Sequence, residues 1–154
     1  MLFYGTKYDT IVSLPKIVID TNILLSALRS NRGASHKLLK MIPENKFTLC
    51  ISPALVLEYK DVLKRHAQKE IQPSEKDVDD ILNYLCSVGE HTKVYYLWRP
   101  MLKDPSDDMV LELAVAAGAG VIVTYNLKDF SGSNRFKISA KTPKDFLHSI
   151  GAIP

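Results

Sequence analysis

The segment 16–20, KIVID, constrains the fold of this chain more than any other feature of its sequence. It is a continuous β-branched apolar run that follows Pro15 and ends in Asp20. Runs without polar alternation are typical of strands that are buried on both faces of a parallel sheet. Directly after it, Ile23, Leu24 and Ala27 recur at helical spacing. We therefore predict a central parallel strand followed by a helix.

Strand and helix patterns alternate along the rest of the chain. Further strands are predicted at 47–52 (FTLCIS), 120–126 (GVIVTYN) and 136–140 (FKISA), and 94–98 (VYYLW) is predicted to be a strand or an extended connection. A second helical segment follows Gly33, and other helices are predicted to begin near residues that cap helices well, namely Ser52, Ser74, Asp104 and Thr142. The polar stretch 131–135 (SGSNR) is predicted to be a loop. This alternation predicts an α/β fold whose parallel sheet is covered on both sides.

Length and composition favour one globular domain. The 154 residues are 46% apolar and 24% charged, which excludes a disordered chain. The net charge of +3 is small, so attraction to a polyanion would depend on where the charges lie. Residues 1–15 show no clear period, and we treat them as an N-terminal extension of a single domain at 16–154.

Location and redox state follow from what the sequence lacks. It has no signal-peptide pattern and no uncharged apolar stretch of about 18 residues, so we expect a cytoplasmic protein that does not span a membrane. Cys50 falls in a predicted strand and Cys86 in a predicted helix, with no CxxC pair. We interpret both as buried reduced thiols.

Acidic side chains stand where a parallel sheet binds ligands, beyond the carboxyl ends of its strands. Asp20 ends the first strand, where an ordinary role as a helix N-cap can coexist with a ligand role. Glu58 lies in an amphipathic helix near the edge of its apolar stripe, so it is either a solvated residue or one that points into a cleft.

Two further groups are predicted to converge on the same edge. The first group consists of three aspartates at the predicted start of the 104–117 helix. Helix capping and the helix dipole explain most of this group, although three carboxylates within five residues repel one another unless a cation offsets them. The second group lies at the C-terminal end of the 120–126 strand and just after it. The members are Asp104, Asp107 and Asp108 in the first group, and Thr124, Asn126 and Asp129 in the second.

Oxygen ligands of this kind suit Mg²⁺ or Mn²⁺, which prefer octahedral oxygen coordination. The four histidines, at positions 36, 66, 91 and 148, are too scattered for a zinc motif. Carboxylates that hold one or two such ions can support phosphodiester hydrolysis, in which the metal activates water and stabilises the leaving oxygen.

Four motifs, in this order, resemble the PIN domain family, and within it the VapC-like toxin branch of prokaryotic toxin-antitoxin systems. They are IVIDTNILLSAL, SPALVLEYKDVL, DPSDDMVLELAVAAGAGVIVTYNLKDF and KTPKDFL, and the match runs from about residue 16 to residue 147. The resemblance implies that Asp20, Glu58 and Asp107 are the first three metal-binding acids. The family's fourth acid stands two residues after the strand threonine, where this chain has Asn126, and Asp129 is the substitute that we predict.

The resemblance also implies a three-layer α/β/α fold and a metal-dependent endoribonuclease. Such an enzyme cleaves RNA either at a limited set of sequences or in tRNA. It implies a homodimer and a small antitoxin partner that inhibits the enzyme. The catalytic and metal-binding set is thus Asp20, Glu58, Asp107 and Asp129. Secondary candidates for the site are Asn22, Asp104, Asp108, Thr124 and Asn126.

RNA would meet this site through cations and aromatic rings, since phosphate contacts supply most sequence-independent affinity and rings stack on bases. For each of these side chains the ordinary alternative is a solvated charge or packing in the core. Tyr125 and Lys128, beside the proposed acids, are the two that we assign to RNA. The wider set comprises Lys37, Lys40, Arg65 and Lys103 as cations, and Tyr95, Tyr96 and Trp98 as aromatic residues.

Two other interpretations compete with the nuclease. Asn126 in place of an acid suggests a catalytically weak PIN fold that acts as an RNA-binding or protein-interaction module. A phosphatase of another α/β class is disfavoured because residues 20–22, DTN, lack the DxD nucleophile pattern.

Overall fold

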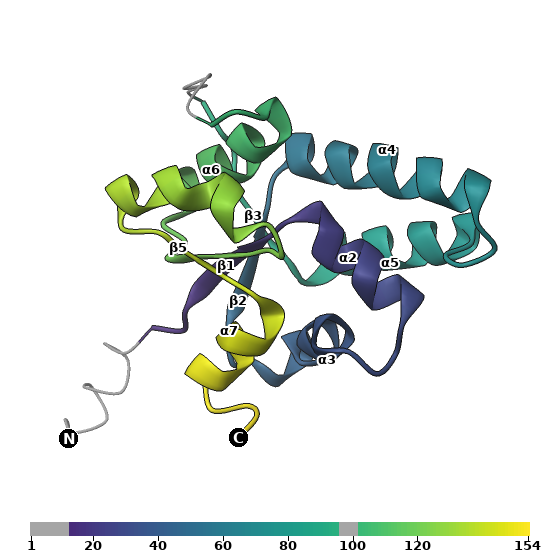
Figure 1. The fold of residues 1–154 in the computed structure, drawn as a ribbon, viewed down its shortest axis with the longest axis horizontal. Helices are drawn as coiled ribbons and strands as arrows, with labels where there is room; N and C mark the ends of the chain where they lie inside the picture. Colours follow the sequence, from purple (N-terminus) through teal and green to yellow (C-terminus); the bar gives the residue numbers. More distant parts are fainter. Residues whose placement is uncertain (1–12, 96–101) are drawn as a thin grey trace.

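A parallel sheet forms the centre of the computed structural model, which describes residues 13–95 and 102–154 (Figure 1). Within these ranges the sheet has five strands in the order β3-β2-β1-β4-β5, and all neighbours pair in parallel. The central position of β1 confirms the interpretation of KIVID. The strands are β1 (Lys16–Ile19), β2 (Thr48–Ile51), β3 (Glu90–His91), β4 (Val121–Val123) and β5 (Ser139–Lys141).

Helices cover both faces of this sheet and produce the three-layer α/β/α fold. One face carries α2, α3, α5 and α7, and the other carries α6 and the 3₁₀ segment η2 (Figure 1). The long helix α4 links the two layers through contacts with α2, α5 and α6. The bounds are α2 (Thr21–Arg29), α3 (Ala34–Lys40), η1 (Ile42–Glu44), α4 (Pro53–Lys69), α5 (Glu75–Val88), α6 (Pro105–Ala117), η2 (Leu127–Phe136) and α7 (Pro143–Ser149).

Polar caps fix where the predicted helices begin. Ser74 forms a capping box with Asp77, and proline takes the first position of α4, α6 and α7. The side chains of Ser52, Asp104 and Thr142 accept hydrogen bonds from the first turns of the helices that they precede. The helix starts that we predicted are thereby confirmed.

The edge strand lies before the VYYLW segment, for which the sequence left a strand or an extended connection open. Strand β3 is Glu90–His91, whereas Val94 and Tyr95 of the VYYLW segment lie outside any strand, and residues 96–98 fall outside the described ranges. The neighbouring strand β2 ends at Ile51 because Ser52 caps α4, and the Thr92 amide donates to the Ile51 carbonyl as the last contact of the pair. β2 therefore offers no partner to residues further along.

Two predictions were wrong in detail. The SGSNR stretch belongs to η2 rather than to a loop, and buried Ser133 donates to the Ile138 carbonyl at 2.8 Å. This turn keeps the FKISA segment out of the sheet until Ser139. Cys50 is buried as expected, but Cys86 is exposed on α5.

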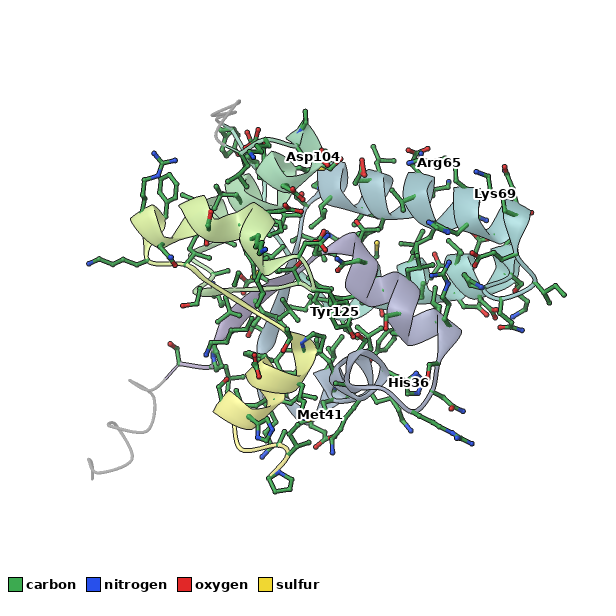
Figure 2. The ribbon with its side chains drawn as sticks, viewed as in Figure 1. His36, Met41, Arg65, Lys69, Asp104 and Tyr125 are labelled. Carbon is green, nitrogen blue, oxygen red and sulfur yellow. The ribbon has the colours of Figure 1, made fainter. Side chains whose placement is uncertain are left out.

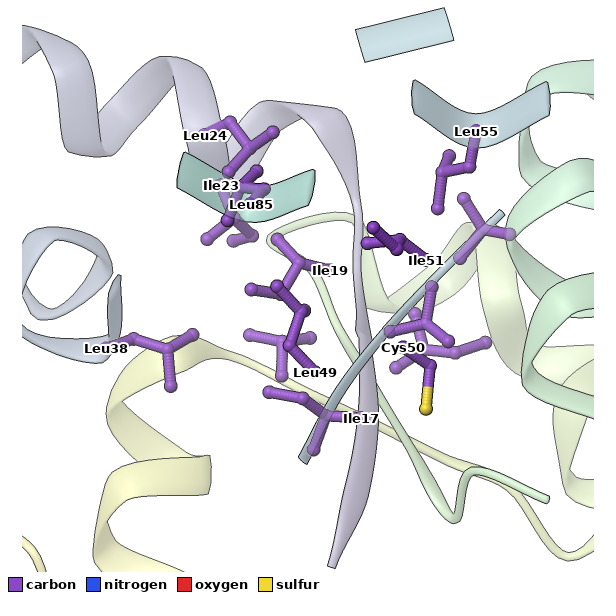
Figure 3. Packing of buried hydrophobic residues seen from close by; sticks show 14 of the residues in the cluster. Ile17, Ile19, Ile23, Leu24, Leu38, Leu49, Cys50, Ile51, Leu55 and Leu85 are labelled. Atoms are coloured by element: carbon purple, nitrogen blue, oxygen red, sulfur yellow. The ribbon is translucent and has the colours of Figure 1, made fainter. Parts of the chain in front are cut away.

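The core lies between the sheet and its helices. Ile17, Leu49 and Leu38 of α3 meet on one side of the sheet, while Cys50 points to the other side, as the two-residue period of a strand requires (Figure 3). Tyr59 of α4 is also buried, and its hydroxyl donates to the Ile19 carbonyl at 2.5 Å. This hydrogen bond ties α4 to the end of β1, one residue before Asp20.

Among the helices that the structure describes, none is long and apolar enough to cross a membrane.

Gly89 provides a test of how tightly α5 packs on β2. A Cβ there would lie 2.8 Å from the Leu85 carbonyl oxygen and 2.9 Å from the Ile51 Cδ1. We predict that Gly89→Ala lowers the free energy of unfolding by about 1–3 kcal/mol, because the added methyl overpacks this contact. Gly120→Ala is the matched control, since a Cβ there meets nothing within 4 Å. Urea unfolding of both variants checks the prediction, and equal stabilities would contradict it.

Candidate functional site

Asp20 stands at the carboxyl end of β1 and begins α2. One carboxylate oxygen, Oδ1, accepts from the Thr21 amide at 2.8 Å, so Asp20 is the helix N-cap. Its own amide donates to the Val123 carbonyl of β4, which holds the residue in line with the sheet. The side chain is 8% exposed, so this carboxylate sits in a largely buried position.

Thr124 links the end of β4 to Asp20. Its hydroxyl donates to Asp20 Oδ2 at 2.7 Å and accepts from the Asn126 amide at 2.9 Å. The Thr124 side chain is fully buried, and its amide pairs with the Lys141 carbonyl of β5. The ends of three neighbouring strands are thus joined by hydrogen bonds around the Asp20 carboxylate.

The first turn of α6 carries three more acids. Asp104 is exposed and caps the helix, with Oδ1 accepting from the Ser106 amide at 2.9 Å. Asp108 is buried and Oδ1 accepts from the Leu102 amide at 2.7 Å, so it holds the chain before the helix. Asp107 is 9% exposed. α6 packs on β1 and β4, which brings this turn to the edge where Asp20 lies.

Electrostatics shows that these acids form one cluster. Burial, which is the largest cause, and the charges of Asp20, Asp104, Asp129 and Asp108, in that order, together raise the pKa of Asp107 to about 7. Burial also raises the pKa of Asp20, and so do Asp129 and Asp104, whereas the hydrogen bonds from Thr124 and Thr21 lower it. The charges of four neighbouring aspartates therefore act on Asp107, and two of these aspartates also act on Asp20.

Asn126 and Asp129 occupy the segment between β4 and η2. Asn126 is the N-cap residue of η2, and its carbonyl accepts from the Asp129 amide at 3.1 Å. Both side chains are exposed, as is Lys128 between them. Of the two candidates for the fourth acid position, Asp129 is the one whose charge acts on both Asp20 and Asp107.

Glu58 is the sequence-predicted acid that the structure joins least to the others. It is half-buried in the second turn of α4, and it is not among the described carboxylates whose charge acts on Asp20 or Asp107. Its neighbour Tyr59 contacts the carbonyl of Ile19, which brings this turn of α4 to the end of β1.

Asn22, in the first turn of α2, contributes a polar atom with no partner. Its Oδ1 is buried and accepts no hydrogen bond from any residue in the described ranges.

By distance alone, the acids do not form a closed ligand cage: residues 13–95 and 102–154 contain no group of three or more His, Cys, Asp or Glu side chains placed to hold a metal ion.

Tyr125, which we assigned to RNA from its position, has hydrogen-bond partners within the protein. It is 45% exposed, but its hydroxyl hydrogen-bonds with Ser35 Oγ at 2.5 Å and with Ser26 Oγ at 3.4 Å (Figure 2). No sequence pattern indicates these serines as partners, because 90 residues separate Ser35 from Tyr125. The hydroxyl therefore faces α2 and α3.

The cationic and aromatic side chains that we expected to meet RNA are distributed unevenly. Arg65 is exposed and paired with Asp61 on α4 at 3.1 Å, Lys37 and Lys40 lie on α3, Lys103 precedes α6, and Lys128 lies in η2. Tyr95 is exposed, and Tyr96 and Trp98 lie outside the described residues. The exposed lysines are Lys37, Lys40, Lys103 and Lys128.

A cavity of about 700 Å³ lies away from the acids, between α2, α3 and α5. Its apolar lining includes Leu28, Leu39 and Ile81, and cationic side chains such as Arg32 and Lys40 stand beside them. We regard the acid cluster as the chemical centre, because it gathers the buried carboxylates with raised pKa values.

Comparisons with known proteins agree with this geometry. A search of curated proteins finds no match. Among solved structures, a chain in the crystal structure of VapBC2 from Rickettsia felis, bound to a DNA fragment from their promoter, is similar with a TM-score of 0.56. The identity is 18%, and the match covers 82% of this chain and 98% of that one, which establishes a shared fold. The family model for the PIN domain matches residues 16–128, and the chain belongs to the PIN domain family.

Proposed function

We propose that this protein is a metal-dependent endoribonuclease and the toxin of a toxin-antitoxin pair. The observation that carries the proposal is the cluster of carboxylates at the carboxyl end of the sheet, where burial and neighbouring negative charges raise the pKa values of Asp20 and Asp107. Membership of the PIN domain family and the fold shared with a VapBC2 chain support it.

The donor set fits a hard divalent cation. The pKa of Asp107 is raised to about 7 by burial and by neighbouring negative charges, and a bound cation would offset this repulsion. The buried and unpartnered Oδ1 of Asn22 adds an oxygen two residues from Asp20. Mg²⁺ keeps several waters and needs one or two carboxylates, so a closed cage of three acids is not required.

We assign the following roles to the residues of the chain. Asp20, Asp107 and Asp129 would hold Mg²⁺ or Mn²⁺, and Glu58 is the proposed fourth acid on α4. When bound, such an ion lowers the pKa of a coordinated water and stabilises the leaving oxygen of a phosphodiester. Thr124 orients the Asp20 carboxylate through Oδ2.

RNA would approach this edge of the sheet, where Lys128 lies beside Asp129. Its cationic side chain is exposed and can neutralise a backbone phosphate, the contact that supplies sequence-independent affinity.

We propose the cytoplasm as the compartment, consistent with the free thiols of Cys50 and Cys86.

A small antitoxin and a second copy of the chain are the proposed protein partners. The fold is shared with a chain solved as part of VapBC2, which supports the first of these. The cavity between α2, α3 and α5 is a suitable surface, because it combines an apolar lining with Arg32 and Lys40 and so favours a partner with apolar and acidic side chains.

The stability of the metal-free protein should depend on the protonation of Asp107. Its pKa is about 7 in the folded state against a usual 3.8, so the folded protein keeps a proton that the unfolded chain releases. The free energy of unfolding should therefore fall as pH rises from about 4 to about 7. In EDTA, Asp107→Asn should reduce this fall in the free energy of unfolding. Asp80→Asn, at an exposed position of α5, should leave the fall unchanged. Urea unfolding at about pH 5 and about pH 8 checks this, and identical pH dependence in wild type and Asp107→Asn would contradict it.

Cleavage of a mixed, end-labelled RNA pool tests the function itself. We expect cleavage with Mg²⁺ or Mn²⁺, none in EDTA, and a loss of at least about 100-fold in an Asp20→Asn, Asp107→Asn double variant, the scale on which groups that stabilise developing charge act. Asp80→Asn, which removes an exposed acid paired with Lys76, is the matched control and should cleave normally.

Metal-independent cleavage, or full activity in the double variant, would overturn the nuclease proposal. If neither protein cleaves any RNA class but the wild type binds RNA, the protein is a binding module, and Asn126 becomes the first residue to examine.

A further inference from the structure

Tyr125 lies in the segment that connects the end of β4 to the acids of the site. This segment, residues 125–129, is exposed and runs between two fully or almost fully buried residues, Thr124 and Phe130. It carries Asn126 and Asp129, the two candidates for the fourth acid position. Its conformation therefore decides where those side chains stand relative to Asp20.

Short hydrogen bonds connect this segment to Asp20 on one side. The Thr124 hydroxyl donates to Asp20 Oδ2 at 2.7 Å and accepts from the Asn126 amide at 2.9 Å. The Asn126 carbonyl in turn accepts from the Asp129 amide at 3.1 Å. A displacement of the backbone at residue 125 would consequently be transmitted to Asn126 and Asp129.

Tyr125 itself connects the segment to α3 on the other side. Its hydroxyl meets Ser35 Oγ at 2.5 Å, and Ser35 is only 1% exposed and sits in the first turn of α3. The second contact, with Ser26 Oγ of α2, is longer at 3.4 Å. In Figure 2 Tyr125 lies near the centre of the view, in the region of α2 and α3. A buried hydroxyl that loses its partner is costly, so the Ser35 contact resists movement of the ring.

We propose that Tyr125 is a positioning residue: its hydroxyl fixes the 125–129 segment to Ser35, and this places Asn126 and Asp129 against Asp20. The inference rests on the proposed function in so far as Asp20 and Asp129 hold a metal ion. It assigns the tyrosine to the geometry of the site rather than to stacking on an RNA base. The ring is retained in Tyr125→Phe, so this variant separates the two roles.

Calorimetric titration with Mn²⁺ of the wild type, Tyr125→Phe, Ser35→Ala and the double variant tests the inference. We expect each single variant to bind Mn²⁺ about threefold to tenfold more weakly, the scale of one net hydrogen bond. The double variant should be no weaker than the singles, because both remove the same contact. Ser26→Ala is the matched control and should change the affinity less, since its contact is 3.4 Å long. Effects that add in the double variant, or an unchanged affinity in Tyr125→Phe, would overturn the inference.

RNA kinetics provide a readout that separates positioning from base stacking. Tyr125→Phe should lower kcat while leaving KM for RNA within about twofold, because the aromatic face is kept and stacking depends on that face. A normal kcat with a raised KM would show that the hydroxyl contacts the substrate, and would overturn the assignment.

Hydrogen exchange of the metal-free protein tests the inference independently of the proposed function. If the wild type binds no Mn²⁺, the metal-dependent function fails, but the contact of Tyr125 with Ser35 can still be measured. Faster exchange of the Asn126 and Asp129 amides in both Tyr125→Phe and Ser35→Ala would support it, with the amides of α5 as an internal reference. Unchanged exchange of these two amides would overturn it.

Discussion

Strand β1 pairs in parallel with β2 on one side and with β4 on the other, and the positions of Asp20 and Thr124 follow from this pairing. In a parallel sheet the carboxyl ends of neighbouring strands lie at one edge. Asp20 and Thr124 are the residues that follow β1 and β4, so their side chains meet, and the 2.7 Å hydrogen bond between them is a direct result of the register. The buried apolar faces of β1 keep that register fixed.

Like charges at this edge work against folding. Helix α6 brings Asp104, Asp107 and Asp108 toward Asp20, and burial together with these charges raises the pKa of Asp107 to about 7. Local hydrogen bonds offset part of the repulsion: the Leu102 amide donates to Asp108 Oδ1, and the Ser106 amide donates to Asp104 Oδ1. Such strain at a functional site is usual where a cation or a substrate is the intended partner.

Two acids at this edge have both a structural role and an electrostatic one. Asp20 is both a helix cap and the centre of the acid cluster, and Asp104 caps α6 while its charge acts on Asp20 and Asp107. Capping orients a carboxylate at the N-terminus of a helix, where the helix dipole also favours negative charge. A structural explanation and a functional one therefore describe the same side chains without conflict.

The sequence alone predicted the parallel sheet apart from β3, and it named the residues of the candidate site. Apolar runs and polar caps act over a few residues, so they identified β1, the starts of α4 to α7, and Asp20 and Asp107 as candidate ligands. It did not predict β3, since the length of that strand depends on where β2 ends, and it was wrong at η2, where Ser133 donates a hydrogen bond to the Ile138 carbonyl. Only the tertiary structure decided that Tyr125 meets Ser35 across 90 residues and that the pKa of Asp107 is raised, because both depend on contacts between distant segments.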